Sequence, residues 1–159
     1  MRTILMAVLG SAALTSAAAA PSAPATRGVT DPRAFVESVY RTGLDDADDE
    51  AAPVYTRRLA ALFADEHRDA GNEVGRMDFS YWTSSQDFEI RSVNVTSEAV
   101  YGRPDRRVIV ADVDNMGHRV LNRFYFERTG TSWFLDDVRN VEAPGDGGWT
   151  LSLILKYGN

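Results

Sequence analysis

The sequence predicts an α+β fold in which N-terminal helices pack in the concave face of a curved, mostly antiparallel four-stranded sheet. Three observations favour this class. Two segments with apolar residues at helical spacing come first, period-two alternation starts at Phe88, and glycine-containing turns divide that alternation into strands. The length of 159 residues and the 44% hydrophobic content suit a single core. Helices that precede all the strands predict helices segregated on one face of a meander.

The N-terminus has the pattern of an export signal. Arg2 is followed by the apolar run ILMAVLGSAAL and then by TSAAAAPSAPA, which offers small residues for cleavage after Ala18 or Ala20. The run is short for a membrane span. We therefore predict a signal peptide over residues 1–20, a flexible leader over 21–29 and one α+β domain over 30–157. The mature protein is expected in the periplasm or the medium, without membrane insertion.

The first predicted helix begins at Thr30-Asp31-Pro32, a capping residue followed by Pro in the first turn, and Gly43 ends it. Its apolar residues fall at helical spacing: Phe35, Val36, Val39 and Tyr40. The run LDDADDE over residues 44–50 lacks the alternating ligands and the glycine of a calcium loop, so a solvated acidic loop is expected.

Pro53 is expected to open a second helix that runs to Asp69 and ends before Gly71. The apolar stripe of this helix is Tyr55, Leu59, Leu62 and Phe63. The charged residues are assigned to its other faces, and Glu66 is among them.

The strands follow from Phe88 onward. A change of parity between Ile90 and Val93 indicates a bulge or a twist, and a turn is expected at 102–105. Near the end of the sheet, Trp133 and Leu135 are expected on one face. Phe134 and Val138 are expected on the other face. The tail WTLSLILKYGN is interpreted as a short helix ended by Gly158, with a strand as the alternative.

Composition excludes several classes of function. A formal net charge of −6 argues against nucleic-acid binding, which needs a basic surface. The chain has no cysteine, so thiol catalysis, disulfides and thiolate metal sites are excluded. The standard nucleotide-binding and metalloprotease motifs are absent as well. We therefore predict no cofactor and no metal.

Candidates for catalysis are few. His67 lies near the end of the second predicted helix, where a cation suits the helix dipole, and His118 lies at a hairpin tip. A site formed by Asp112, Asp114 and His118 is conceivable, but turn chemistry explains these residues first. Asp136 and Asp137 should point to opposite faces of a strand. One of the two could act as a base under the sheet, or it could cap a backbone group or pair with Arg119, Arg123 or Arg139.

The stretch MDFSYWTSSQDFEI over residues 77–90 is the strongest binding candidate. Asp78, Gln86 and Asp87 could contact a ligand or could brace the backbone of the loop. Tyr81 and Trp82 could be exposed aromatic anchors, although burial under the sheet is the more frequent outcome for such residues. The structural interpretation predicts that Asp87→Ala costs stability.

The segments PRAFVESVY, YTRRLAALF, MDFSYWTSSQDF and SWFLDDVRN together resemble a bacterial exported family catalogued as domain of unknown function 3828. The resemblance covers residues 30–141 and is most specific at Asp78, Gln86 and Asp87. At Phe79-Ser80 the chain departs from the family pattern, which has Pro or an acid there. The resemblance implies a small cone-shaped fold like that of nuclear transport factor 2, and it implies export. It transfers no catalytic residue.

Three functions remain open at this point. The first is a non-enzymatic binding module for an envelope protein or a small ligand, for example an inhibitor or immunity-type protein, since an acidic surface steers basic partners. The second is a cone-fold enzyme of the isomerase, dehydratase or hydrolase type, which would need a polar cavity under the sheet. The third is a structural module that forms a homodimer through the sheet.

Overall fold

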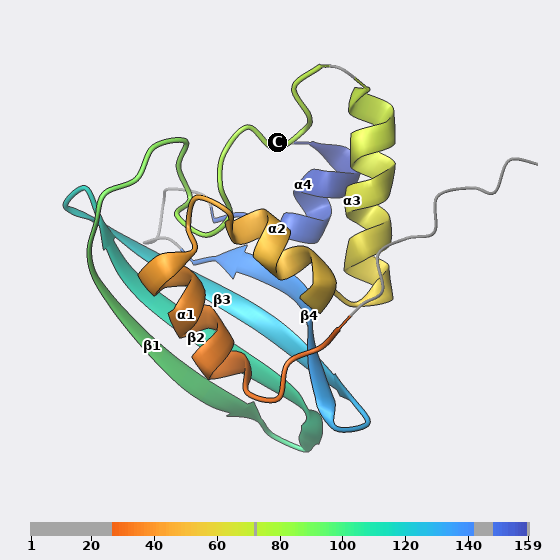
Figure 1. Ribbon diagram of the computed structural model, residues 1–159, viewed down its shortest axis with the longest axis vertical. Coiled ribbons are helices and arrows are strands. Elements are labelled where there is room, and N and C mark those ends of the chain that lie inside the picture. Colours follow the sequence, from red (N-terminus) through yellow and green to blue (C-terminus); the bar gives the residue numbers. More distant parts are fainter. Residues whose placement is uncertain (1–26, 72, 142–147, 159) are drawn as a thin grey trace, which may run out of the picture.

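The computed structural model describes residues 27–71, 73–141 and 148–158. The predicted signal peptide and most of the predicted leader lie outside this part of the chain. The described elements follow the predicted order (Figure 1). They are the helices α1 (Pro32–Thr42), α2 (Ala47–Ala51) and α3 (Arg57–Ala70), the 3₁₀ turn η1 (Ala52–Val54), the strands β1 (Ile90–Val100), β2 (Arg103–Asn115), β3 (His118–Thr129) and β4 (Ser132–Asn140), and the helix α4 (Leu151–Tyr157).

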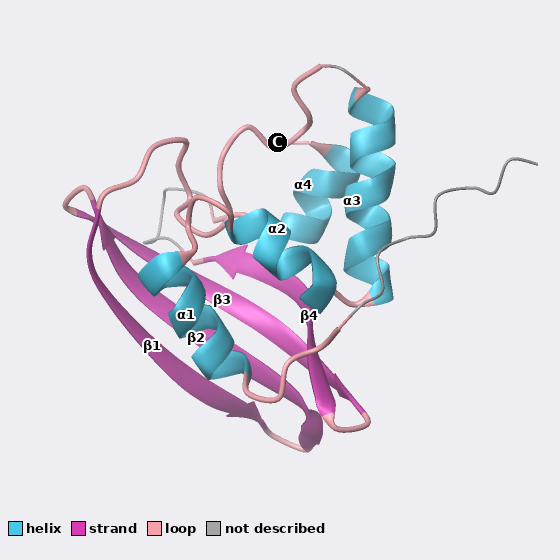
Figure 2. Ribbon diagram, viewed as in Figure 1, coloured by secondary structure: helices cyan, strands magenta, loops and turns pink. Residues whose placement is uncertain are grey.

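The strands form one antiparallel sheet in the order β1-β2-β3-β4, which confirms the α+β class and the four-stranded meander (Figure 2). The sheet is curved, and α1 lies across its concave side against β1 and β2 (Figure 1). Helices α3 and α4 pack against each other and against β4. The helical layer therefore covers one face and the β4 end of the sheet.

Local signals correctly predicted the limits of α1. The Asp31 carboxylate accepts hydrogen bonds from the backbone N–H groups of Arg33 and Ala34, and Pro32 occupies the first turn. This side chain satisfies two donors that would otherwise have no partner in the helix. Gly43 follows the last turn, as predicted.

The region between α1 and α3 differs from the prediction. The acidic run is not entirely a loop, because residues 47–51 form the short helix α2. Pro53 belongs to the 3₁₀ turn, and α3 begins only at Arg57, with Thr56 as its capping residue. The reason is tertiary: Tyr55 is extended and bridges to Leu135 of β4, so the chain cannot be helical there.

The strands carry irregularities that alternation only partly reveals. The predicted bulge in the first strand is confirmed between Ile90 and Ser92. A second irregularity, between β3 and β4, makes Asp136 an extra residue on β4. The prediction that Val138 faces away from Leu135 is therefore wrong, because the inserted residue reverses the parity. The first hairpin turn lies at Tyr101-Gly102, earlier than expected, so residues 103–105 belong to β2.

The concave side of the sheet is filled by side chains. The largest fully buried residues include Trp82 and Tyr81 from the loop before β1, Phe124 and Phe126 from β3, and Leu59 from α3. The tail forms a helix, as expected, and α4 adds Leu151, Ile154 and Leu155 to the buried set. None of the helices in the described part of the chain has the length and apolar content that a membrane crossing needs.

Candidate functional site

Three asparagines on the sheet hold the loop that precedes β1. Asn122 of β3 donates from its amide nitrogen to the carbonyls of Tyr81 (3.1 Å) and Trp82 (2.8 Å). Its amide oxygen accepts from Ser84 and from Asn140 of β4. Asn115 of β2 donates to Ser85. All three asparagines are buried, so the strands, rather than the acids of the loop, fix its backbone.

Tyr81 and Trp82 belong to the core. Both are 0% exposed, so the packing alternative is confirmed and the exposed-anchor alternative is wrong. The Tyr81 hydroxyl is 2.8 Å from that of Tyr55, and the Tyr40 hydroxyl donates to the Trp82 carbonyl at 2.6 Å. Burial raises the pKa of Tyr40 and of Tyr81, and neighbouring Tyr55 adds to the rise at Tyr81.

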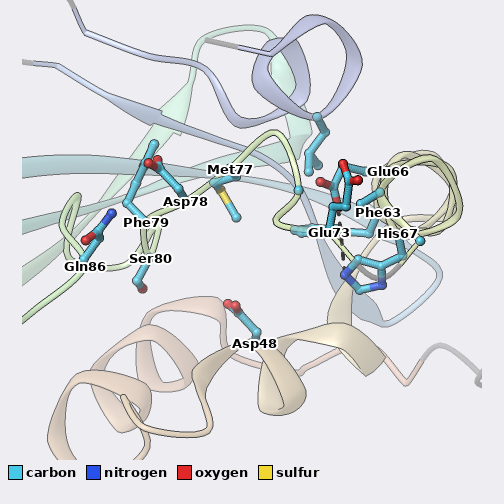
Figure 3. A pocket seen from close by; sticks show the side chains of 14 residues that line it. Asp48, Phe63, Glu66, His67, Glu73, Met77, Asp78, Phe79, Ser80 and Gln86 are labelled. Carbon is cyan, nitrogen blue, oxygen red and sulfur yellow. Dashed lines mark ion pairs between the residues drawn. The ribbon is translucent and has the colours of Figure 1, made fainter.

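An open crevice lies beside this core, between α3, the chain from Gly71 to Ser80, α2 and α4 (Figure 3). Its volume is about 560 Å³, within the range of small-molecule sites. One wall consists of apolar side chains: Phe63, Met77, Phe79 and Leu155. Four separate segments of the chain therefore build this crevice.

The crevice is acidic. Its lining carries four carboxylates, those of Asp48, Glu66, Glu73 and Asp78, and none of its described lining residues is Lys or Arg. Arg76 lies between the lining residues Gly75 and Met77, but its guanidinium has partners of its own. Its guanidinium donates to the Leu155 carbonyl and pairs with Asp69 at 2.8 Å. The charge of Asp48 also contributes to the raised pKa of buried Tyr81, after burial itself and Tyr55.

Glu66 is the most buried of these acids, at 6% exposure. One carboxylate oxygen accepts from the backbone N–H of Arg76 at 2.7 Å, which ties α3 to the chain that follows it. A Cβ at Gly75 would stand 1.8 Å from the same oxygen, so this position accommodates only glycine while the carboxylate stays in place. Glu66 was expected on a charged face of the helix, and that expectation is wrong. It lies seven residues after Leu59 and four after Leu62, on the apolar stripe itself.

The predicted binding residues separate into two groups. Asp78, Gln86 and the catalytic candidate His67 line the crevice together, although they come from different segments (Figure 3). Asp87 is exposed and lies outside the lining. Within the described residues, neither the Asp78 nor the Asp87 carboxylate makes a hydrogen bond or an ion pair, so the prediction that they brace the loop is wrong.

His67 is an exposed residue of the last turn of α3, as expected, with its side chain 78% exposed. Its Nε2 is 4.0 Å from a carboxylate oxygen of Glu66, and its ring tilts against Phe63. A histidine this open, with only a long contact to an acid, is not held in the fixed geometry that general-base catalysis requires.

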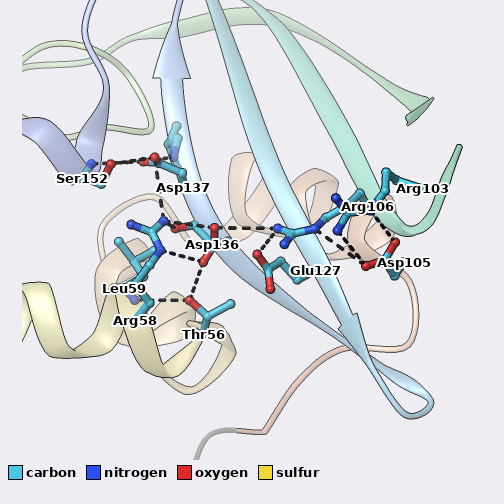
Figure 4. Close-up of polar contacts among 11 residues, drawn as sticks. Thr56, Arg58, Leu59, Arg103, Asp105, Arg106, Glu127, Asp136, Asp137 and Ser152 are labelled. Carbon is cyan, nitrogen blue, oxygen red and sulfur yellow. Dashed lines mark hydrogen bonds and ion pairs between the residues drawn. The ribbon is translucent and has the colours of Figure 1, made fainter. Parts of the chain in front are cut away.

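Asp136 and Asp137 are structural ligands of helix starts, not free bases (Figure 4). Asp136 accepts from the Thr56 hydroxyl (2.8 Å) and from Arg58 Nε (3.0 Å) at the beginning of α3. Asp137 accepts from the backbone N–H (3.0 Å) and the hydroxyl (2.7 Å) of Ser152 in the first turn of α4. The extra residue in β4 allows both acids to approach Arg58, at 3.0 and 3.8 Å, so the prediction of opposed directions fails.

The pairing alternative therefore describes Asp136 and Asp137, but with Arg58 as the main partner in place of the predicted Arg119, Arg123 or Arg139. Arg106 of β2 also lies 3.9 Å from the Asp136 carboxylate. The hydrogen bond to Asp136 is the main cause that raises the pKa of Arg58. The network continues along the outer face of the sheet to Arg106, which pairs with Glu127, and to Asp105 (Figure 4).

The hairpin between β2 and β3 behaves as turn chemistry predicts. The Asp114 carboxylate accepts from the Gly117 N–H at 2.8 Å, and Asp112 receives a hydrogen bond of 2.7 Å from Arg119 Nε. Nowhere in the described chain do three or more His, Asp or Glu residues gather in a way that could hold a metal ion. His118 and Arg119 line a second hollow, together with the loop residues Thr83 to Ser85.

Sequence reasoning missed three acids of the crevice and most of its apolar wall. Glu66 could have been found, because an acid on an apolar helical stripe is unusual. Asp48 and Glu73 carried no signal, since their meeting depends on how α2 and the chain after α3 fold together.

The chain was compared with family models, with curated proteins and with solved structures, and nothing in the three sets matches it.

Proposed function

We propose that this chain is an exported, non-enzymatic binding module, and that its crevice accepts a positively charged group, an ammonium or a guanidinium. The group could belong to a small molecule or to a basic side chain of an envelope protein. The proposal includes the cone shape, like that of nuclear transport factor 2, and the membership of the exported family that the sequence resembles. The curved four-stranded sheet with helices on its concave side supports the shape.

The observation that carries the proposal is the charge of the crevice. Four carboxylates line one hollow, and none of its described lining residues is Lys or Arg, while most other acids on the described surface pair with arginines. Carboxylates that line one hollow together raise the local negative potential and attract cations. The wall of Phe63, Met77 and Phe79 adds apolar contact for the hydrocarbon part of such a ligand.

The enzyme alternative receives less support from the structure. It requires a polar cavity under the sheet, and Trp82, Phe124 and Phe126 fill that region. The acids proposed as bases, Asp136 and Asp137, accept hydrogen bonds at the starts of α3 and α4. The polar groups of the crevice remain, and they suit recognition better than proton transfer, because the exposed His67 there is 4.0 Å from the Glu66 carboxylate.

Titration calorimetry with small probes tests the proposal. We expect 1,5-diaminopentane and agmatine to bind, and pentanoate and pentanol, of similar length but without positive charge, not to bind. Binding of the cations should weaken as salt is added, because exposed charges are screened. A protein whose heat of binding is the same for pentanol and for the diamine would contradict the proposal.

Matched variants locate the site. Glu73→Gln and Asp78→Asn each remove one exposed carboxylate of the crevice and should weaken binding roughly five-fold, or about 1 kcal/mol. Glu37→Gln removes an acid on α1, outside the crevice, and should leave binding unchanged. If the small amines bind only weakly, while a lysine-rich envelope protein binds tightly and is displaced by a high concentration of agmatine, the cation is a side chain of a partner.

Export is part of the proposal and has its own test. N-terminal sequencing of mature material should start near residue 19 or 21. Material that still begins at Met1 would contradict the exported location while leaving the crevice assignment intact.

A further inference from the structure

The two edges of the sheet are treated differently by the rest of the chain. Along β4, Val29 bridges to Trp133, Tyr55 bridges to Leu135, and Thr150 bridges to Arg139. Along β1, no described residue pairs with the side that faces away from β2. Alternate residues of β1 therefore direct their N–H and C=O groups outward, where another strand could bind them.

The open edge lacks the features that usually prevent such pairing. From Ser92 to Ala99 the register with β2 is regular, and the irregularities lie only at its two ends. This stretch has no proline and no lysine, and Glu98 is its only charge. That charge is directed to Arg123 of the same sheet, at 2.9 Å. Natural edge strands are commonly protected by charge, proline or a central bulge.

Exposed apolar residues gather at the same edge. Among the large hydrophobic residues exposed in the described chain, Val93 (37%) and Val100 lie on β1, and Phe88 and Tyr101 lie within two residues of its ends. The others are Val74, Met116 and Val141 in loops and hairpins, and Leu153 and Tyr157 on α4. Along β1, an unpaired backbone edge therefore occurs together with exposed apolar side chains on the strand and beyond both of its ends.

We propose that a second copy of this chain pairs with β1, antiparallel, through a two-fold axis perpendicular to the sheet, so that two four-stranded sheets become one. Charge along the strand is compatible with a second copy. The two-fold axis can pass through any residue from Val93 to Thr96, which then lies opposite the same residue of the other copy. In each of these registers, Arg91 and Glu98 face uncharged residues of the other copy. The self-pairing of this strand therefore sets no like charges against each other, and it covers the exposed edge of both copies at once.

Sedimentation of the purified protein over a range of concentrations tests this inference. The wild-type protein should sediment as a dimer, and Val93→Lys and Thr96→Lys should each shift it to a monomer by placing a charge on the edge. Leu153→Lys also converts an exposed apolar residue to lysine, but on α4, and should remain a dimer. Far-ultraviolet circular dichroism confirms that each variant is folded.

Hydrogen exchange supplies a second readout that does not depend on any variant. Amides of Ser92–Ala99 that face away from β2 should exchange more slowly at concentrations where the dimer forms. A wild-type protein that stays monomeric overturns the inference. So does a dimer in which Val93→Lys behaves like Leu153→Lys, or in which protection falls outside β1. None of these outcomes bears on the crevice, which lies on other elements.

Discussion

Asn122 is the side chain whose replacement tests most severely how the loop before β1 is held. In Asn122→Ala the Tyr81 carbonyl loses its donor, and no other described residue donates to it. An orphaned buried carbonyl costs about 1–3 kcal/mol. The Trp82 carbonyl keeps its hydrogen bond from Tyr40, and Ser84 and Asn140 keep the hydrogen bond between them. The loss of each of their hydrogen bonds to Asn122 therefore costs less, about 0.5 kcal/mol. The expected loss of unfolding free energy is about 2.5–4.5 kcal/mol.

Urea unfolding followed by tryptophan fluorescence measures this loss, because Trp82 is fully buried beside Asn122. Asn94→Ala, an exposed asparagine of β1, is the matched control and should change stability by less than about 0.5 kcal/mol. Asp87→Ala should be equally mild, although the sequence alone predicted a cost. If Asn122→Ala is as stable as the control while Asp87→Ala is destabilised by more than about 1 kcal/mol, the loop is held by its own acids and the reasoning is refuted.

Three further predictions concern single contacts. Gly75→Ala should destabilise the protein by about 1–3 kcal/mol, because the new Cβ displaces the Glu66 carboxylate. In a Glu66→Ala background, a double-mutant cycle should find a much smaller loss of stability from Gly75→Ala. Hydrogen bonding from Arg119 lowers the pKa of Asp112. The stability that this pair adds is therefore present above the ordinary pKa of 3.8 and is lost as the pH falls through the lower pKa of the folded protein. In Arg119→Met, a carboxyl NMR titration should find the Asp112 pKa raised toward 3.8. Asp137→Ala removes the acceptor at the start of α4, so its amides should exchange faster with solvent while those of β2 stay protected; equal protection of α4 in both proteins would contradict the capping role.

Local chemistry explains the parts of the fold that the sequence predicted well. Asp31 before Pro32 and Gly43 after the helix act within a few residues, so their signals can be interpreted without a structure. The same holds for Gly158 after α4 and for period-two alternation in the strands. Long-range contacts explain the failures. Tyr55 is extended because it bridges to β4, and nothing near Pro53 in the sequence carries that information.

The candidate site was predictable only in part, for the same reason. Asp78, Gln86 and His67 were chosen as separate polar residues, and their convergence depends on how α3 packs beside the loop. The asparagines that hold the loop were not identified, since an asparagine within a strand has no local pattern that points to a distant carbonyl. An extra residue in β4 directs Asp136 and Asp137 toward the same arginine, and alternation alone predicts the opposite.

The most direct test of the central claim is to map a bound cation on the protein by NMR. Agmatine titrated into labelled protein should shift the resonances of Glu73, Asp78, Phe79 and the His67 ring, and those of the outer sheet face should stay in place. In Asp78→Asn the same shifts should need roughly five-fold more agmatine if the crevice carboxylates hold the guanidinium. Shifts confined to the outer face of the sheet, or no shifts at millimolar agmatine in low salt, would contradict the account.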